Sequence, residues 1–140
     1  MRARPGPRSR PPGRDPNVSS TSDAEVIRSA LAAMNAGDFE AAAEFIDDDV
    51  VWHYIGGTEP IRGKAGMVAL AGDRAFTLTN KVHDILVSDD HAVALVEATA
   101  TRGDRTLHYR TAEVCHMRDG KLVERWAFSD DTAAIVDFFA

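Results

Sequence analysis

The sequence predicts an α+β domain in which a curved antiparallel β-sheet is closed on one side by three helices in its N-terminal half. Apolar residues recur at helical spacing between about residues 22 and 46, but this period disappears from about residue 76, where strand-forming residues dominate. Short turn sequences at 88–90, 102–104 and 118–120 separate the strand-like segments. Long strands joined by short turns pair as antiparallel neighbours, and such a sheet curls around a concavity that helices close on one side.

The helices are placed by their capping residues. Ser22 and Glu25 form a capping box, so the first helix is expected to begin at Ser22 and to end at Gly37. Its apolar stripe is Ile27, Leu31 and Met34. Asp38 is expected to cap a second helix, whose apolar positions are Phe39, Ala42, Ala43 and Ile46.

The strands follow these helices. A first strand is expected at 50–54, closed by two glycines, and a short third helix is expected at 63–70. Four long strands then complete the sheet, at about 76–88, 91–101, 105–117 and 121–129.

Residues 1–20 differ from the rest of the chain, and we expect a disordered, dispensable tail before a domain at 21–140. The tail is rich in proline, and its five arginines and Asp15 give it a charge of about +4 within a chain of net charge −6. A basic arm for an anionic partner is the alternative interpretation. The remaining body carries about −10, which argues against nucleic acid as a partner.

The composition predicts a soluble, cytoplasmic protein without a membrane-spanning segment. No apolar stretch approaches the roughly 18–20 residues that a membrane helix needs, and the N-terminus lacks the apolar run of a secretory signal. The single cysteine, Cys115, excludes an internal disulfide and fits a reducing compartment.

Four segments resemble the nuclear transport factor 2-like superfamily, which includes SnoaL-like polyketide cyclases, ketosteroid isomerase and limonene epoxide hydrolase. They are Gly37-Asp38, Asp49–Tyr54, Pro60–Lys64 and Asp119–Trp126. The resemblance implies a cone around a deep apolar pocket, a small apolar organic ligand and a homodimer formed through the outer sheet face. It also implies either a cofactor-free isomerase, cyclase, dehydratase or epoxide hydrolase, or a non-catalytic ligand-binding or interaction module.

The catalytic residues of these relatives transfer only in part. The general-base aspartate of the isomerase falls on Tyr54, its phenolic donor falls on Ala30, and its second acid falls on Glu113. The arginine and two aspartates of the epoxide hydrolase fall on Glu97, Thr99 and Ala127. Neither mechanism is therefore expected to transfer unchanged.

The resemblance directs Glu113 into the pocket, and strand alternation then gives the remaining lining. The expected lining residues are Tyr109, Thr111 and Cys115 on its own strand, Arg125, Ala127 and Ser129 on the last strand, and Trp52 and Tyr54 on the first. A three-residue turn at 102–104 would place Glu97 opposite Tyr109, whereas a two-residue turn would place it opposite Arg110. Both turns suit the sequence, and both glutamates could instead lie at the rim.

The sharpest prediction is an ion pair between Glu113 and Arg125. A three-residue loop at 118–120 pairs Met117 with Lys121, and counting back sets Glu113 opposite Arg125. A two-residue turn would instead set Glu113 opposite Trp126. A buried carboxylate paired with arginine stays ionised and can act as a base or an anchor.

The candidate catalytic residues are thus Glu113, Arg125, Tyr54 and Glu97, acting by acid/base chemistry without a cofactor. Cys115 is expected to be a small buried residue and not a nucleophile. No metal is expected, because His108 and His116 share a strand face but lie about 26 Å apart at ~3.3 Å per residue.

Apolar residues expected at the surface also favour a homodimer. Trp126, Phe128 and His108 would lie on the outer face of the sheet, and the chain has an apolar segment at 135–139. The alternative is that this segment folds back over its own cone.

Overall fold

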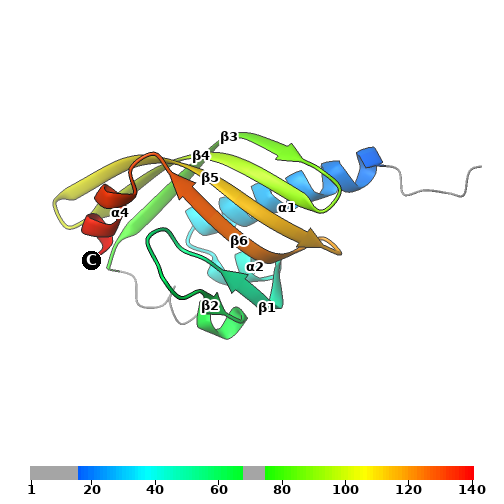
Figure 1. Ribbon diagram of the computed structural model, residues 1–140, viewed down its shortest axis with the longest axis horizontal. Coiled ribbons are helices and arrows are strands. Elements are labelled where there is room, and N and C mark those ends of the chain that lie inside the picture. The colour runs from blue at the N-terminus through cyan, green and yellow to red at the C-terminus, as the bar shows by residue number, and fades with distance from the viewer. Residues whose placement is uncertain (1–15, 68–74) are drawn as a thin grey trace, which may run out of the picture.

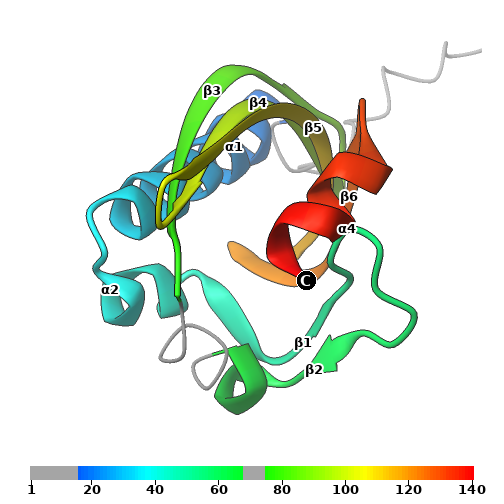
Figure 2. The same cartoon turned by 90° about the vertical axis from the view of Figure 1, so that its left-hand side faces the viewer.

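The computed structural model describes residues 16–67 and 75–140 and confirms the predicted α+β fold. A six-stranded sheet with the order β2-β1-β6-β5-β4-β3 curves without closing (Figure 1). Viewed along the cone, β3, β4 and β5 arch over α1, while β1 and β2 lie on the opposite side of the enclosed space (Figure 2).

Helix α1 (Pro16–Asn35) begins before the predicted start at Ser22. Proline is favoured in the first turn of a helix, where its missing N–H removes no hydrogen bond, so Pro16 is compatible with this earlier start. Residues 16–20, which we expected in the tail, are helical, whereas residues 1–15 of the predicted tail lie outside the described residues. Gly37, with a φ of 75°, follows the helix as expected.

The expected cap of the second helix is confirmed. The Asp38 side chain accepts a hydrogen bond of 3.0 Å from the amide of Ala41, at the start of α2 (Phe39–Ala43). Ile46, which we expected on this helix, instead begins a strand. Residues 64–67 are helical, and the rest of the predicted third helix lies outside the described residues.

The four long strands form the predicted antiparallel meander. They are β3 (Thr77–Val87), β4 (His91–Arg102), β5 (Arg105–Arg118) and β6 (Lys121–Ser129). The β4–β5 hairpin has a two-residue turn, because Arg102 pairs with Arg105. This register sets Glu97 opposite Arg110 and resolves the alternative that the sequence left open.

The first strand departs from the expected antiparallel pattern. β1 (Ile46–Trp52) runs parallel to β6 and antiparallel to the short β2 (Ile61–Arg62). It ends at Trp52 and does not extend to Tyr54. A parallel pair needs a long connection, which the rest of the chain supplies by passing through β3, β4 and β5 before it returns beside β1.

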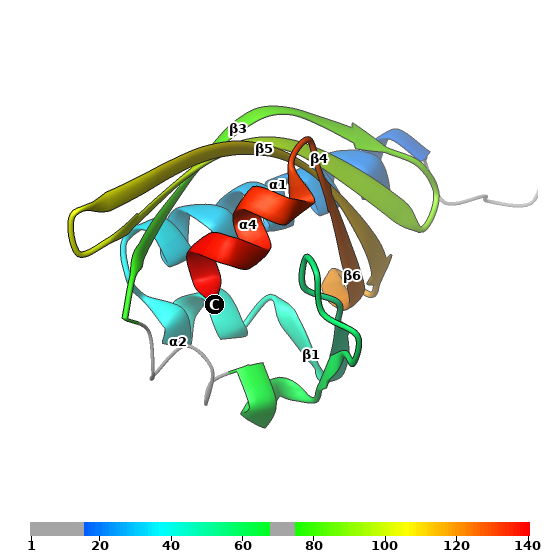
Figure 3. The ribbon, with the colours of Figure 1, turned by 60° about the vertical axis from the view of Figure 1, so that its left-hand side comes forward.

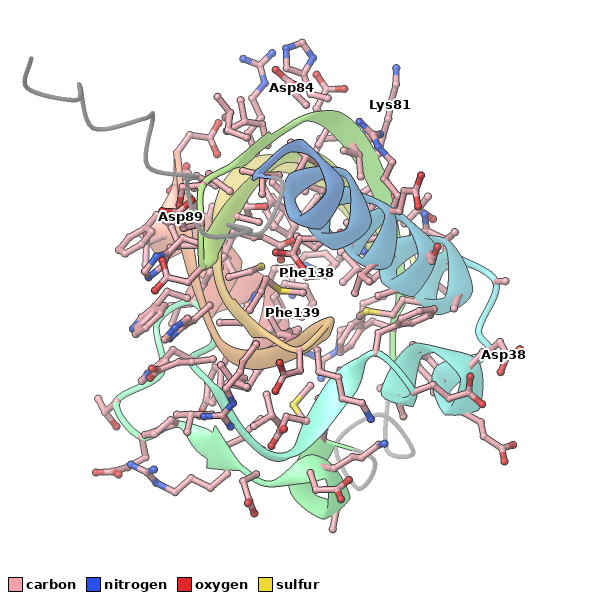
Figure 4. The ribbon with its side chains drawn as sticks, turned by 90° about the vertical axis from the view of Figure 1, so that its right-hand side faces the viewer. Asp38, Lys81, Asp84, Asp89, Phe138 and Phe139 are labelled. Atoms are coloured by element: carbon pink, nitrogen blue, oxygen red, sulfur yellow. The ribbon has the colours of Figure 1, made fainter. Side chains whose placement is uncertain are left out.

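The apolar segment near the C-terminus folds back, as the alternative interpretation held. Helix α4 (Thr132–Phe139) is capped by Asp131, buries Ile135 and Phe138, and lies across the concave side of the sheet (Figure 3). The Phe138 and Phe139 side chains point into the enclosed space, whereas Lys81 and Asp84 on β3 point away from it (Figure 4).

The core lies between α1 and the concave face of the sheet. Alternate residues of β4 are buried, and most of them are alanines, so α1 packs close to the strand. The buried members of this core are Ile27, Leu31, Ala92, Ala94, Val96, Cys115 and Met117. None of the helices that the structure describes combines the length and apolar character needed to cross a membrane.

Candidate active site

A cavity of about 750 Å³ lies between the concave face of the sheet and the helices that close it. This volume falls in the range of pockets that enclose a small organic molecule. Its wall is largely apolar, and the described residues that interrupt it with side-chain polar groups are Trp52, Tyr54, Asn80, Tyr109, Thr111, Glu113, Cys115 and Arg125.

Glu113 and Arg125 form the charged centre of this wall. An Arg125 Nη2–H donates to Glu113 Oε1, which confirms that the two residues form an ion pair. The Arg125 and Glu113 side chains are only 11% and 13% exposed. Because the pair is buried, removal of one partner leaves the charge of the other uncompensated.

Arg125 is held from two further directions. Its Nη1 donates a 3.2 Å hydrogen bond to the main-chain oxygen of His53, and its guanidinium lies 4.3 Å from the centre of the Trp52 ring. Its Nε–H is buried and has no hydrogen-bond acceptor among the described residues. Trp52 is thus both cavity wall and support for the guanidinium.

The register that produces the pair differs from the predicted one. Arg118 pairs with Lys121 across a two-residue turn, in which Asp119 and Gly120 have φ values of 52° and 74°. A bulge then leaves Val123 unpaired. The bulge shifts the ladder by one residue, so Glu113 lies opposite Ala127 and meets Arg125 diagonally on the same face.

Cys115 lies directly opposite Arg125 in this ladder and is 5% exposed. Burial raises the pKa of its thiol to about 12; the Glu113 charge adds to this shift, and Arg125 opposes it. The thiol is therefore protonated at neutral pH, which agrees with the expected role as a buried wall residue and not a nucleophile.

Tyr54, Tyr109 and Thr111 also line the cavity, as expected. Tyr54 follows β1 and is 46% exposed. The Tyr109 ring meets the Phe139 ring edge-on at 6.5 Å between centroids. Thr111, between Tyr109 and Glu113 on the same strand face, is 8% exposed.

Three expected site residues are not part of the cavity wall. Ala127 and Ser129 do not line it, and the Ser129 hydroxyl instead lies 3.3 Å from that of Thr132 at the start of α4. Glu97 lies on the outer face, because its register partner Arg110 does, and both border a separate hollow with Phe128 and Asp130. The two-residue β4–β5 turn is the physical reason for this orientation.

Sequence reasoning missed the contribution of α4. Ile135, Val136 and Phe139 line the cavity, and an added Cβ at Gly56 would meet Val136 at 2.3 Å, so the loop after β1 lies tightly against this helix. The apolar spacing of 135–139 indicated a packed segment, but this pattern suits a dimer contact as well as packing over the cavity.

The histidines also lie differently from expectation. His91 and His116 are register partners whose rings stack at 4.8 Å between centroids, and Asp90 lies 2.8 Å from His91 Nδ1. This cluster lies on the outer face, away from the cavity. Among the described residues, no group of three or more histidine, cysteine or acidic side chains is arranged to hold a metal ion.

The sequence profile of the SnoaL-like domain family matches residues 27–125. The sequence has no significant match among curated proteins.

Several solved structures share the fold. Bal32a, from a soil-derived mobile gene cassette, superposes with a TM-score of 0.77 at 24% identity, over 86% of this chain and 98% of its own. An LEH-like epoxide hydrolase from M. tuberculosis gives 0.74 at 19% identity, over 86% and 89%. IdmH, a putative polyketide cyclase from Streptomyces antibioticus, gives 0.68 at 24% identity, over 84% and 99%.

Proposed function

We propose that this chain, which belongs to the family of SnoaL-like domains, binds a small, largely apolar carbonyl compound and moves a proton on it without a cofactor. The observation that carries the proposal is the buried Glu113–Arg125 pair in the wall of an otherwise apolar cavity. Structures with the same fold include proteins named as an epoxide hydrolase and a putative polyketide cyclase, which is consistent with small-molecule chemistry.

Glu113 acts as the base in this proposal. Its Oε1 is held by Arg125, and a carboxylate has two oxygens, so Oε2 can accept a proton from a carbon next to the ligand's carbonyl group. The electron pair of the broken C–H bond moves to the carbonyl oxygen and forms an enolate. Return of the proton to the same or another carbon completes an exchange or an isomerisation, so the step needs no oxidant or reductant.

The developing negative charge on the carbonyl oxygen requires a donor. Arg125 has N–H groups beyond the two that bind Glu113 and His53, and Thr111 presents a hydroxyl on the same strand face as Glu113. Preorganised donors in a water-poor site stabilise such a charge strongly. Tyr54 and Tyr109 also line the cavity, and in this proposal they orient the ligand.

Deuterium exchange tests this proposal. We expect the protein to catalyse exchange in D2O at the carbons next to the carbonyl group of 4-phenylbutan-2-one, followed by NMR. Glu113→Gln should reduce the catalysed rate by about 100-fold or more, a range typical of removing a general base. Glu97→Gln is the matched control, because it makes the same change on the outer face of the sheet. Equal rates for the wild type and Glu113→Gln would refute the role of Glu113.

A non-catalytic ligand-binding protein is the second candidate, and one observation favours it. Glu113 is the only acidic side chain among the described residues that line the cavity, so no second acid side chain is available there to return a proton at another carbon. Titration of the ketone against Trp52 fluorescence, in a Trp126→Phe background, separates the two candidates. Saturable binding without exchange would establish the binding function.

We also propose a homodimer formed through the outer face of the sheet. Leu86 and Phe128 on this face are 55% and 62% exposed. Lys81, Glu97 and Arg110 follow one another across β3, β4 and β5, so a row of alternating charges lies beside the apolar residues. We expect a dimeric mass by light scattering at micromolar concentration and a monomeric mass for Phe128→Glu. A monomeric wild type would refute the proposal.

A further inference from the structure

Strand β5 runs along the cavity, so its inward side chains show how the wall changes from one end to the other. Its alternate residues from Tyr109 to Met117 all line the wall. Glu113 is the third of these five residues, with two lining residues on either side of it. The charged pair therefore lies at the middle of the cavity and not at its end.

The Tyr109 end is aromatic and close to solvent. Phe139 packs edge-on against Phe76, at 4.8 Å and 67°, and against Tyr109, and all three rings line the cavity. We call these three residues the aromatic end. Val136, one turn before Phe139 on α4, is 46% exposed. A ligand ring placed at this end would lie among aromatic rings, which favour contacts with another ring.

The Met117 end is closed and mainly aliphatic. Ile27, Leu31, Ile46 and Met117 are each between 4% and 8% exposed, and Leu122 lies beside them in the cavity wall. We call these five residues the aliphatic end. Phe45 lies next to it, since its main-chain oxygen accepts a hydrogen bond from the Leu122 amide. Arg125, which lies opposite Cys115 and belongs to the ion pair, is the only charged side chain among the described lining residues on this side of Glu113.

From this distribution we infer that the ligand is a ketone with an aromatic ring on one side of its carbonyl group and an aliphatic arm on the other. The ring occupies the aromatic end, the carbonyl group lies at Glu113 and Arg125, and the arm fills the closed aliphatic end. The inference rests on the proposed function and names its substrate class. A polar group at the end of the arm would lie unpaired in the aliphatic end, which costs binding free energy.

Two isomeric ketones test the position of the carbonyl group. In 1-phenyloctan-3-one it lies between the ring and a pentyl arm, whereas in 8-phenyloctan-2-one it lies at the far end of the chain. Their composition is the same, so nonspecific hydrophobic binding is closely matched. We expect kcat/KM for deuterium exchange to be at least about tenfold higher for 1-phenyloctan-3-one, and higher than for 4-phenylbutan-2-one by up to about fourfold per added methylene.

A pair of alanine variants tests the aliphatic end. Ala30 lies one turn from Ile27 on α1 and lines the cavity, whereas Ala32 is exposed and does not. Ala30→Leu should reduce exchange of 1-phenyloctan-3-one about tenfold more than it reduces that of 4-phenylbutan-2-one, because the added side chain occupies the space of the arm. Ala32→Leu makes the same change outside the cavity and should leave the ratio unaltered.

The outcomes separate the inference from the proposed function. If the wild type exchanges both isomers equally and Glu113→Gln abolishes exchange, the inference is wrong and the proposed function stands. If Ala30→Leu leaves the ratio of long to short ketone unchanged, the aliphatic end does not hold the arm, and the inference is also wrong. If no ketone binds or exchanges its protons, both the inference and the proposed function are wrong.

Discussion

Cys115 lies directly opposite Arg125 in the β5–β6 ladder, while Glu113, which binds Arg125, lies opposite Ala127. The ion pair is therefore a diagonal contact between residues that share a face, and not a pair of direct register partners. The unpaired Val123 makes this possible, because without the shift it introduces, the two-residue turn would set Glu113 opposite Trp126. The bulge thus decides which side chains of β6 face the cavity.

A mutant cycle tests how the pair contributes to stability. Arg125→Met leaves the Glu113 carboxyl buried without its partner, and we expect a loss of about 3–5 kcal/mol in the free energy of unfolding. The double variant Arg125→Met/Glu113→Leu removes both charges and should recover most of that loss. Urea unfolding of the wild type, Arg125→Met, Glu113→Leu and the double variant measures the coupling free energy. A single variant as stable as the wild type would show that the buried pair is not coupled.

The raised pKa of Cys115 predicts a loss of stability at alkaline pH. Its folded-state pKa of about 12 exceeds the ordinary value of 9.0, so between these values the unfolded chain releases the thiol proton first. Its contribution is fully present below pH 9 and is lost as the pH rises toward 12. We expect the wild type to lose about 1 kcal/mol more than Cys115→Ala between pH 7 and 10.

Reactivity of the same thiol gives an independent check. The native protein at pH 8 should react with a thiol-specific disulfide reagent far more slowly than the urea-unfolded protein, because only the thiolate attacks. Rapid modification of the native protein, together with equal alkaline stability of the wild type and Cys115→Ala, would contradict this description of the site.

The sequence predicted the features of the site that depend on local patterns. Alternation along a strand has a period of two residues, so Tyr109, Thr111, Glu113 and Cys115 were placed on one face from their spacing once Glu113 was directed inward. The pairing of Glu113 with Arg125 was predicted through the wrong register. The predicted and observed registers differ by two residues, which preserves the face, and for this reason the ion pair was still correct.

Features that depend on distant partners could not be predicted in the same way. The parallel pairing of β1 with β6 and the position of α4 over the cavity are set by packing between segments far apart in the chain. The outward direction of Glu97 depended on a turn for which the sequence allowed two lengths. The start of α1 at Pro16 was missed because the capping box at Ser22 gave a stronger local signal.

The start of α1 changes the expected effect of N-terminal truncation. A chain that begins at Pro16 should unfold at the temperature of the full chain, because residues 1–15 have no apolar pattern with which to pack on the body. A chain that begins at Thr21 also loses the first turn of the helix and should lose about 1 kcal/mol, or about 4 °C. Calorimetry of the two proteins checks this, and a lower Tm for the chain beginning at Pro16 would show that residues 1–15 pack on the domain.

Arg102 is expected to hold α4 closed over the cavity. From the tip of the β4–β5 hairpin its Nη1 donates to the main-chain oxygens of Phe138 and Ala140, at 3.1 and 2.9 Å. Charged donors to main-chain oxygens contribute about 1.5–3 kcal/mol. Arg102→Ala should therefore accelerate amide exchange at 135–140 by about tenfold and speed dissociation of a bound ketone, since Phe139 forms part of the wall.

Arg105 provides the matched control on the same hairpin. It lies 3.3 Å from Asp137, but the two side chains are 52% and 83% exposed, and such surface pairs contribute little. Its guanidinium also lies 5.1 Å from the centre of the Phe138 ring, and an exposed contact of this kind contributes about 0.5–1 kcal/mol. Arg105→Ala should consequently change amide exchange in α4 by at most about fivefold, which is less than the effect of Arg102→Ala. Arg102→Lys keeps the charge but loses the planar guanidinium, so it should restore only part of the protection. If Arg102→Ala and Arg105→Ala have equal effects on exchange in α4, the helix is held by general charge attraction and not by the hydrogen bonds of Arg102.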